Sequence, residues 1–438
     1  MKSLATILLV LLSFSVNAEN WPQWRGPVFN GSTTQTGLPA TWSKTENVAW
    51  VAPMPGPSAA TPAIWDDRVF VSSVDTKTKD LLALCLNRKD GKVLWQKVVA
   101  PSADRRPMNS RNNNMASPSP ITDGKNVWFF YGTGHLAAFD IDGKELWSRD
   151  LQKDFNKFAI MWGYGASGLL YKDKLYIPLL QKDKNTYVPG SDLSKKLDSF
   201  ILAVDPKTGK DLWKQVRPTD AKEETQEAYT TPIPCEFNGK SEILIYGADY
   251  TTAHDPETGK ELWRCGGINP VHRGDVRVVP SPVCCDGLVF MAPPKHWQAF
   301  TAIKDGGSGD VTATNVAWTL PKEMSPDVCT PLVYKNMLYV LNGDAGRSML
   351  YCIDPKTGAK KWEGQIPGKT TYWCSPTCAD GRIYSINEAG EVAVCEAGDA
   401  FKILMTVPLG EGACFSSIAI AQGQLFIRTG QNVYCIGK

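Results

Sequence analysis

Short apolar strands separated by polar turns follow one another along almost the whole chain. The runs at residues 69–71 and 338–340 are typical, since they hold β-branched, aromatic and leucine side chains and each follows a polar pair, at 66–67 and 335–336. Such side chains favour strands, and Asp and Asn favour tight turns. The pattern therefore predicts an all-β chain of antiparallel hairpins.

One phrase recurs in this pattern: a small apolar strand, an Asp, a turn containing Gly, and a final Trp. Its clearest copies span residues 203–213 and 253–263. A Thr-Pro or Ser-Pro pair opens a partner strand upstream of most copies. Each unit is then four strands and roughly 50 residues long, and four-stranded units at a regular spacing are typical of β-propeller blades.

Eight such units account for the chain, and seven would require one weak unit to be an insertion. We expect the blades at residues 57–100, 112–151, 162–217, 228–267, 278–320, 327–368, 372–410 and 414–438. The last unit has three strands, and residues 47–51 match 315–319 almost residue for residue. We therefore predict a single domain over residues 19–438, an eight-bladed β-propeller of four-stranded antiparallel blades. Its last blade is closed by the N-terminal strand at 47–53, which removes a free sheet edge.

The first 18 residues have the layout of a secretory signal peptide. Lys2 precedes an apolar run at residues 4–12, and small residues at 16 and 18 suit a signal peptidase. We expect cleavage after Ala18 and a periplasmic or secreted protein. Net charge is +2, and no later run of about 18 apolar residues follows. We therefore expect a monomer without a membrane span that does not bind nucleic acid.

The repeated phrase Ala-x-Asp-x-x-Thr-Gly-x-x-x-Trp resembles the pyrroloquinoline-quinone (PQQ)-type propeller repeat. The opening Trp-Pro-Gln-Trp-Arg-Gly-Pro at residues 21–27 is similar to a secreted planctomycete-type group of PQQ-like propellers, mostly without assigned activity. More distantly, the chain resembles quinoprotein alcohol dehydrogenases and the propeller lipoprotein that assists outer-membrane protein assembly. The resemblance implies that the repeat tryptophans pack between neighbouring blades. These are Trp50, Trp95, Trp147, Trp213, Trp263, Trp318 and Trp362.

Twelve cysteines in an exported chain suggest disulfides, but their positions indicate packed thiols in several cases. Cys85, Cys352 and Cys435 take a slot that holds Ala in other copies, where Cys acts as a small apolar residue. A bond between Cys329 and Cys374, at the same position of adjacent blades, is conceivable. Quinoprotein alcohol dehydrogenases carry an adjacent Cys-Cys disulfide over the cofactor. The pair at 284–285 instead precedes a hairpin turn, at the other end of its strand, and is interpreted as two chance neighbours.

The loops that lead into the inner strands are long and differ from one another. In families of this fold these loops share one face, which holds a cofactor or partner. Here they are basic, amide-rich and aromatic, which suits anionic groups and flat rings. The alternative is that the charges are solvated and the aromatic residues fill the channel. The candidate binding residues are Arg105, Arg106, Arg111, Asn112, Asn114, Trp162, Tyr164, Tyr229, His272, Arg273, Arg277, Tyr372 and Trp373.

Two functions follow from this surface. The first, which we favour, is a binding scaffold for an anionic oligosaccharide or a protein segment at the channel mouth. The second is a PQQ-dependent dehydrogenase with Ca²⁺, for which Trp162 is a candidate floor under the quinone. That class needs acidic calcium ligands, and Asp275 and Asp327 are the carboxylates that can be placed near inner-strand entrances. We predict no catalytic residue, no metal site and no firm cofactor.

Overall fold

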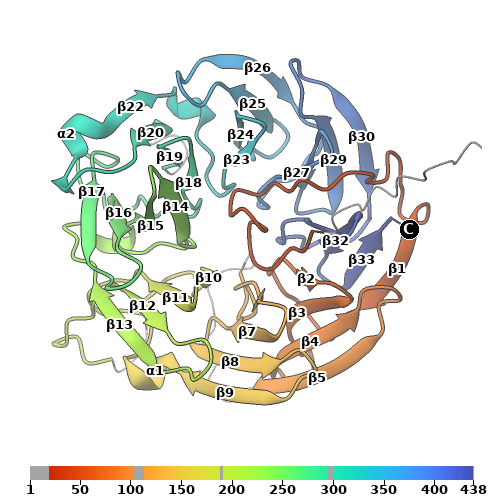
Figure 1. The fold of residues 1–438 in the computed structure, drawn as a ribbon, viewed down its shortest axis with the longest axis horizontal. Helices are drawn as coiled ribbons and strands as arrows, with labels where there is room; N and C mark the ends of the chain where they lie inside the picture. Colours follow the sequence, from red (N-terminus) through yellow and green to blue (C-terminus); the bar gives the residue numbers. More distant parts are fainter. Residues whose placement is uncertain (1–18, 102–112, 188–190, 294–298, 438) are drawn as a thin grey trace, which may run out of the picture.

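The chain folds into eight β-sheets arranged in a ring around a central channel (Figure 1). The computed structural model describes residues 19–101, 113–187, 191–293 and 299–437. Within each sheet, hydrogen-bonded neighbours follow chain order from the inner to the outer strand, except where the N-terminus joins the last blade. The predicted eight-bladed propeller is therefore confirmed.

In each of the first four blades, the first strand lies next to the channel and the following strands lie progressively further out. Blade one holds β2 (Ala63–Trp65), β3 (Arg68–Val74), β4 (Leu81–Asn87) and β5 (Val93–Ala100), and blade two holds β6 (Ile121–Thr122), β7 (Asn126–Phe130), β8 (His135–Asp140) and β9 (Glu145–Asp150). Blade three holds β10 (Leu169–Tyr171), β11 (Lys174–Leu179), β12 (Phe200–Val204) and β13 (Asp211–Val216). Blade four holds β14 (Ile233–Phe237), β15 (Lys240–Gly247), β16 (Tyr250–His254) and β17 (Glu261–Cys265).

The other four blades repeat this order. Blade five holds β18 (Val283–Cys285), β19 (Leu288–Met291), β20 (Thr301–Lys304) and β22 (Val316–Thr319), and blade six holds β23 (Leu332–Tyr334), β24 (Met337–Leu341), β25 (Met349–Ile353) and β26 (Lys360–Gln365). Blade seven holds β27 (Thr377–Ala379), β28 (Arg382–Ile386), β29 (Glu391–Glu396) and β30 (Ile403–Pro408). Blade eight holds β31 (Ala419–Ala421), β32 (Gln424–Arg428), β33 (Asn432–Ile436) and β1 (Val48–Pro53). The short helices are α1 (Leu151–Asp154), α2 (Thr312–Asn315), η2 (Glu223–Gln226) and η3 (Lys322–Met324).

The N-terminal strand closes the ring as predicted. β1 pairs antiparallel with β33, with Trp50 opposite Cys435. Blade four departs from the four-strand plan, because β21 (Gly309–Asp310) of the next blade adds to β17 in parallel. No helix in the described part of the chain is long and apolar enough to cross a membrane.

Each repeat tryptophan stands opposite a small residue, and all but Trp263 reach the next blade. Trp95 pairs across the strands with Cys85, and its indole N–H donates to the Ile141 carbonyl of blade two at 3.0 Å. The indole covers Gly143, whose φ is +88° and whose added Cβ would lie 2.7 Å from the ring. Glycine is needed there both for the positive φ and for the close approach. Indole N–H bonds to the next blade recur at Trp50, Trp147, Trp318 and Trp362.

A ring of hydroxyl groups joins the blades around the channel. The backbone N–H of Thr61 donates to the Ser119 hydroxyl at 3.0 Å, and the N–H of Ser119 donates to the Ser167 hydroxyl at 3.0 Å. The pattern continues with N–O distances of 2.8–3.1 Å through Thr231, Ser281, Thr330, Ser375 and Ser417. Six of the eight blades thus supply both one donor and one acceptor to this ring.

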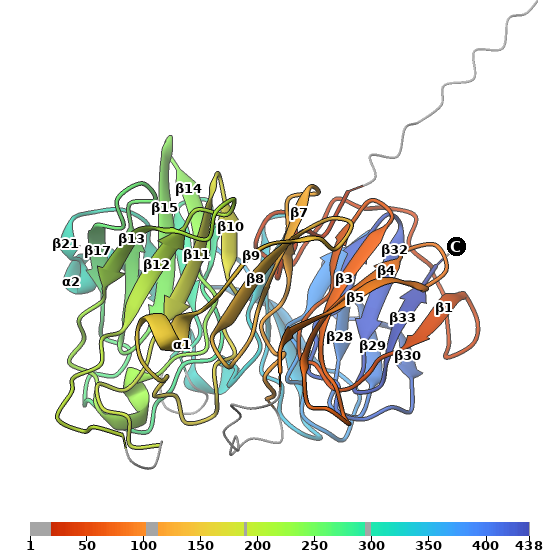
Figure 2. The ribbon, with the colours of Figure 1, turned by 90° about the horizontal axis from the view of Figure 1, so that it is seen from below.

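Residues 19–39, the N-terminal segment, cross one end of the channel (Figures 1 and 2). Arg25 of this segment is 1% exposed. Its guanidinium donates to the carbonyls of Pro376 (2.8 Å), Pro331 (2.6 Å) and Asn30 (2.9 Å). One buried side chain therefore ties blades six and seven to the segment, while the loops that lead into the inner strands lie at the opposite end.

Candidate functional site

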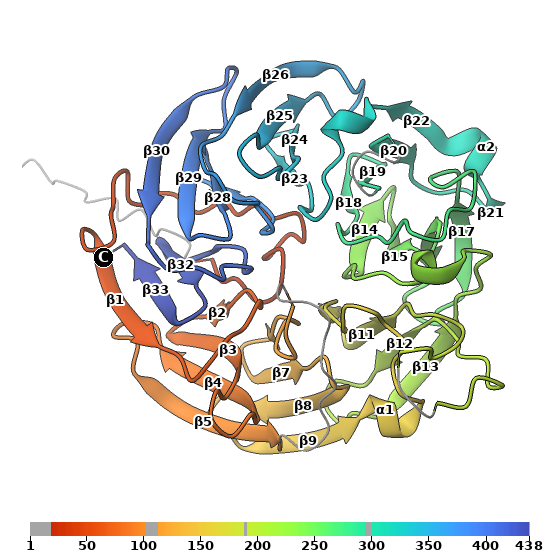
Figure 3. The same cartoon turned by 180° about the vertical axis from the view of Figure 1, so that it is seen from behind.

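A cavity of about 520 Å³ occupies the channel above the N-terminal segment. Its side wall includes the hydroxyl ring, and Trp24 of the N-terminal segment contributes to its lining. The ring is seen from the side of the inner-strand loops in Figure 3. The lining residues are Trp24, Ala59, Thr61, Asn113, Ser117, Ser119, Trp162, Gly165, Ser167, Tyr229, Thr231, Arg277, Val279, Val328, Thr330, Trp373, Cys374, Ser375, Phe415 and Ser417.

Two tryptophans of this cavity are held by carboxylates. The indole N–H of Trp162 donates to Glu224 at 2.8 Å, and that of Trp373 donates to Glu388 at 3.1 Å. The Asn113 amide donates to the Trp162 carbonyl at 2.9 Å and fixes the backbone of this loop. Because each indole is anchored through its N–H, its ring faces stay available for stacking with a flat partner.

Arg277 contributes the positive charge of the described lining. It binds Asp327 through two nitrogens at 3.2 and 3.3 Å and lies 3.9 Å from Glu224. Its side chain is 26% exposed, so the guanidinium is partly desolvated but reachable. An incoming carboxylate can bind Arg277 by competing with Asp327 for the same donors.

Glu227 lies behind the cavity wall and is fully buried. It accepts hydrogen bonds from the Met161 N–H at 2.7 Å, the Tyr187 hydroxyl at 2.5 Å and the Tyr229 hydroxyl at 3.2 Å. Burial raises the pKa of Glu227 to about 7, although these three donors act to lower it. This carboxyl therefore titrates near neutral pH, one hydrogen bond away from a residue that lines the cavity.

The structure brings part of the predicted surface together. Trp162, Tyr229, Arg277 and Trp373 line the cavity, and Asn114 lies beside it, where its amide oxygen accepts from Ala116. Arg105, Arg106, Arg111 and Asn112 lie outside the described residues.

Two predicted wall residues are placed elsewhere, which corrects the sequence interpretation. Tyr164 is 3% exposed and Tyr372 is 1% exposed, and their hydroxyls donate to the carbonyls of Pro178 and Pro367. Both rings pack in the core because their polar tips find backbone acceptors there. Sequence reasoning missed Trp24, Phe415 and Asn113, which lie in stretches without repeat character.

His272 and Arg273 also lie away from the cavity, at the rim of blade four. The His272 ring nitrogens lie 3.6 Å from Asp249 and 3.9 Å from Asp220, and Arg273 forms an ion pair with Asp275 at 2.7 Å. Both side chains therefore face carboxylates, His272 those of two neighbouring loops and Arg273 one of its own loop. Among the described residues, the predicted basic ring is reduced to Arg277 at the cavity itself.

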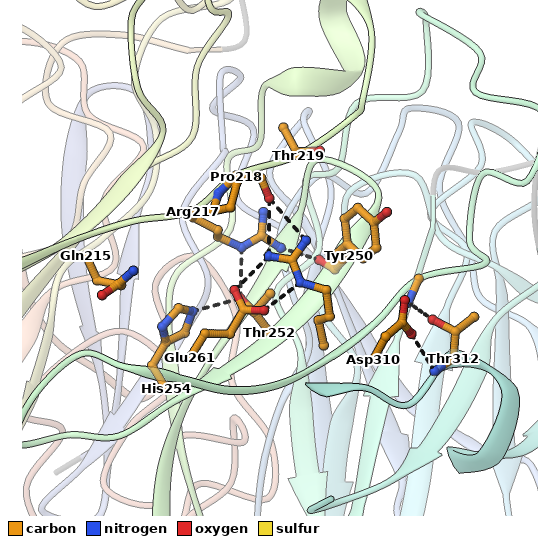
Figure 4. Close-up of polar contacts among 12 residues, drawn as sticks. Gln215, Arg217, Pro218, Thr219, Tyr250, Thr252, His254, Glu261, Asp310 and Thr312 are labelled. Carbon is orange, nitrogen blue, oxygen red and sulfur yellow. Dashed lines mark hydrogen bonds and ion pairs between the residues drawn. The ribbon is translucent and has the colours of Figure 1, made fainter. Parts of the chain in front are cut away.

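A buried polar network lies between blade three and blade four (Figure 4). Arg217 donates to the Thr252 hydroxyl at 2.8 Å and the Tyr250 carbonyl at 2.6 Å. His254 contacts the same hydroxyl at 2.9 Å, and burial lowers its pKa to about 4. His254 is thus a neutral packed residue. The network joins these two blades, and none of its residues lines the cavity.

The lining does not fit PQQ with Ca²⁺. Of the described residues that line the cavity, none carries a carboxylate, whereas Ca²⁺ takes six to eight oxygen ligands, carboxylates prominent among them. The nearby acids described above are already engaged, Asp327 with Arg277, Glu224 with Trp162, Glu388 with Trp373 and Glu227 with three donors behind the wall. Cys284 and Cys285 belong to β18 next to its hairpin turn and do not line the cavity.

Solved structures share this fold at low identity. BamB from Moraxella catarrhalis is 15% identical, with 89% of this chain and 96% of that chain covered and a TM-score of 0.57. A europium-containing methanol dehydrogenase is 11% identical, with 95% and 90% covered and a TM-score of 0.66. A quinohemoprotein alcohol dehydrogenase from Comamonas testosteroni is 12% identical, with 96% and 81% covered and a TM-score of 0.64.

These likenesses concern the fold, because identities of this size do not carry function over. No curated protein matches the chain. Residues 27–161 and 197–436 match the PQQ-repeat family described as "Outer membrane protein assembly factor BamB". The match spans well over half of the chain, which therefore belongs to this family of PQQ-like β-propellers.

Proposed function

We propose that the chain is an exported binding scaffold whose ligand enters the channel cavity from the side of the inner-strand loops. The observation that carries this proposal is the cavity, with aromatic faces, a hydroxyl ring and one arginine. Recognition sites are concave and combine apolar walls with a few placed polar groups. The described lining offers none of the nucleophile–base pairs that hydrolytic chemistry requires.

The lining favours a sugar residue or a peptide side chain that carries one carboxylate. Trp162 and Trp373 offer ring faces to the apolar side of a sugar, and serine and threonine hydroxyls exchange hydrogen bonds with its hydroxyl groups. Arg277 then binds the carboxylate in place of Asp327. A longer acidic oligosaccharide or protein segment would continue across the loops at the mouth.

Calorimetric titration of the purified chain tests this proposal. A panel of uronic-acid oligosaccharides, their neutral counterparts and acidic peptides should show saturable binding of an acidic member. Affinity for its neutral counterpart should be at least about tenfold lower, since a hydrogen bond to a charged group contributes about 1.5–3 kcal/mol. Arg277→Gln should abolish that preference, whereas Arg273→Ala, in the neighbouring ion pair, should not change it. Thermal melts of both variants establish that they are folded.

Three outcomes would contradict the proposal: no binding by any panel member, equal affinity for acidic and neutral ligands, or binding that Arg277→Gln leaves unchanged. A parallel titration with PQQ and Ca²⁺, followed by absorbance, distinguishes the dehydrogenase alternative. Saturable binding of PQQ with a Ca²⁺ requirement would favour that alternative. Export is tested separately, by sequencing the N-terminus of the mature protein, which should begin at Glu19.

A further inference from the structure

The interface between blades four and five lacks the contact that joins other blades. Blade five has no Asp-Pro-x-Thr-Gly turn, and its chain continues from Lys304 into Gly306 and Gly307 instead. The indole N–H of Trp263 consequently donates to Glu242 of its own blade at 2.8 Å. None of the described glycines packs on the Trp263 ring as Gly143 packs on Trp95. The interface is joined instead by the parallel pairing of β21 with β17 and by Phe237, whose ring packs on Gly287 of blade five.

Two cysteines face each other at this interface. In the inner strands of blades one and six, the fourth residue counted from the conserved Ser/Thr packs in a cluster shared with the preceding blade, and the fifth faces the following blade. The second half of this rule is visible at Trp65, whose ring lies 2.2 Å from where a Cβ of Gly124 in blade two would be, and at Tyr334, whose hydroxyl accepts from Gly381 of blade seven at 3.2 Å. Cys235 is the fifth residue in blade four, and Cys284 is the fourth in blade five.

The contacts of both thiols agree with these positions. The Cys284 thiol lies 3.6 Å from the carbonyl oxygen of Pro234, the residue that precedes Cys235. The Cys235 thiol points to the same interface, where it lies 3.7 Å from a carboxylate oxygen of Asp305 in blade five. Both cysteines pack in one apolar cluster. The neighbouring thiol of Cys284, together with burial and Asp305, raises the pKa of Cys235.

We propose that Cys235 and Cys284 form a disulfide that fastens blade four to blade five. Cys284 is half-buried and Cys235 is 2% exposed, so exchange begins at Cys284. The Cys284 thiolate attacks the disulfide of an oxidant, such as glutathione disulfide or an oxidised thiol oxidoreductase, and releases one thiol of that oxidant. The Cys235 thiolate then attacks the mixed disulfide and releases the second thiol. Two thiols of the protein are thereby oxidised, one disulfide of the oxidant is reduced, and two protons pass to the leaving thiolates.

Cys285 is the natural control for this inference. It follows Cys284 in the same strand, so its side chain points to the opposite face, and it packs in a different apolar cluster, with residues of blade six. It is similarly half-buried. A random oxidation of accessible thiols would therefore involve Cys285 as readily as Cys284. The proposed disulfide involves Cys284 and leaves Cys285 as a free thiol.

The test is a peptide map of the full purified chain after incubation with oxidised and reduced glutathione. Free thiols are alkylated in denaturant and the chain is digested with trypsin without reductant. Mass spectrometry should find residues 223–240 linked to residues 278–295. Cys285→Ser should retain the link and Cys284→Ser should abolish it. The oxidised chain should melt about 5 °C above the reduced chain, in the wild type and in Cys285→Ser but not in Cys284→Ser.

Recovery of both Cys235 and Cys284 as alkylated thiols from the oxidised wild type would overturn the proposal. So would a link that survives Cys284→Ser, or a bond between Cys284 and Cys285. The peptide map is read on the wild-type chain first, so that a variant that fails to fold does not decide the result. The inference does not depend on ligand binding.

Discussion

Replacement of Glu227 by Gln should make the protein more stable at pH 8 and leave its stability at pH 4.5 nearly unchanged. Burial raises the pKa of Glu227 from 4.5 to about 7. Below pH 4.5 the carboxyl is protonated in the folded and the unfolded chain alike. Between pH 4.5 and 7 the folded chain holds the proton and the unfolded chain does not, so stability falls as the pH rises through this window.

The size of this effect follows from the pKa difference. At about 1.4 kcal/mol per pKa unit, a rise from 4.5 to about 7 corresponds to a loss of roughly 3 kcal/mol by pH 8. Gln reproduces the protonated acid, because its carbonyl oxygen can accept from Met161 while its amide donates to the Tyr187 oxygen. The variant should therefore escape most of this loss.

Urea unfolding at pH 4.5, 6, 7 and 8 measures the effect. The free energy of unfolding of Glu227→Gln should exceed that of the wild type by a margin that grows to at most about 3 kcal/mol at pH 8. Glu223→Gln, at an exposed acid of the same loop, serves as the control and should follow the wild type. Burial also raises the pKa of Glu242 to about 7, so both proteins keep a residual slope in this window. The reasoning would be refuted if the free energies of unfolding of the wild type and Glu227→Gln changed in parallel with pH. It would also be refuted if the variant's advantage over the wild type were smaller at pH 8 than at pH 4.5.

Three further predictions concern the ring. Gly143→Ala should lower the free energy of unfolding in urea by about 1–3 kcal/mol more than Gly381→Ala does. Both have positive φ, but only the Cβ at 143 would meet an atom within 4 Å, in the ring of Trp95; equal midpoints would contradict the docking role of the glycine. Arg25→Met should cost about 3 kcal/mol or more in the same assay, because it leaves buried carbonyls without donors; an unchanged midpoint would argue against the N-terminal segment as a structural element. Deletion of residues 19–53 should expose an edge of β33 and cause association seen by light scattering, whereas a monomeric truncated chain with an unchanged melt would count against closure.

The ring of blades could be predicted from the sequence because the residue pattern that specifies one blade is repeated in the others. The spacing of Trp95 and Trp147 and the Ala or Cys across from each tryptophan recur in most blades, so a weak signal is read many times. Closure by residues 47–53 was predictable for the same reason. In physical terms, each blade buries the same kind of face against its neighbour, and the same residues serve each time.

The cavity was less predictable because the loops do not repeat. Whether Tyr164 lines the channel or packs in the core depends on loop conformation and on a carbonyl acceptor, at Pro178, that lies in another strand. Trp24 reaches the cavity because the N-terminal segment crosses the ring, and no local pattern marks this path. The contact between Cys235 and Cys284 depends on how blades four and five are oriented relative to each other, and strand patterns alone do not specify this orientation.

The pairing of β1 with β33 has a consequence for the order in which the molecule is completed. β1 leaves the ribosome before all other strands of the described ring and β33 leaves last, so the final hydrogen-bonded ladder joins segments of very large sequence separation. Contacts of this kind form slowly, because the intervening chain must first be ordered. A nascent or prematurely terminated chain that lacks β33 cannot close and keeps an exposed strand edge, which proteases and chaperones bind. Ring closure thus distinguishes finished molecules from unfinished ones, and it makes proteolytic resistance a property that arises in a single late step.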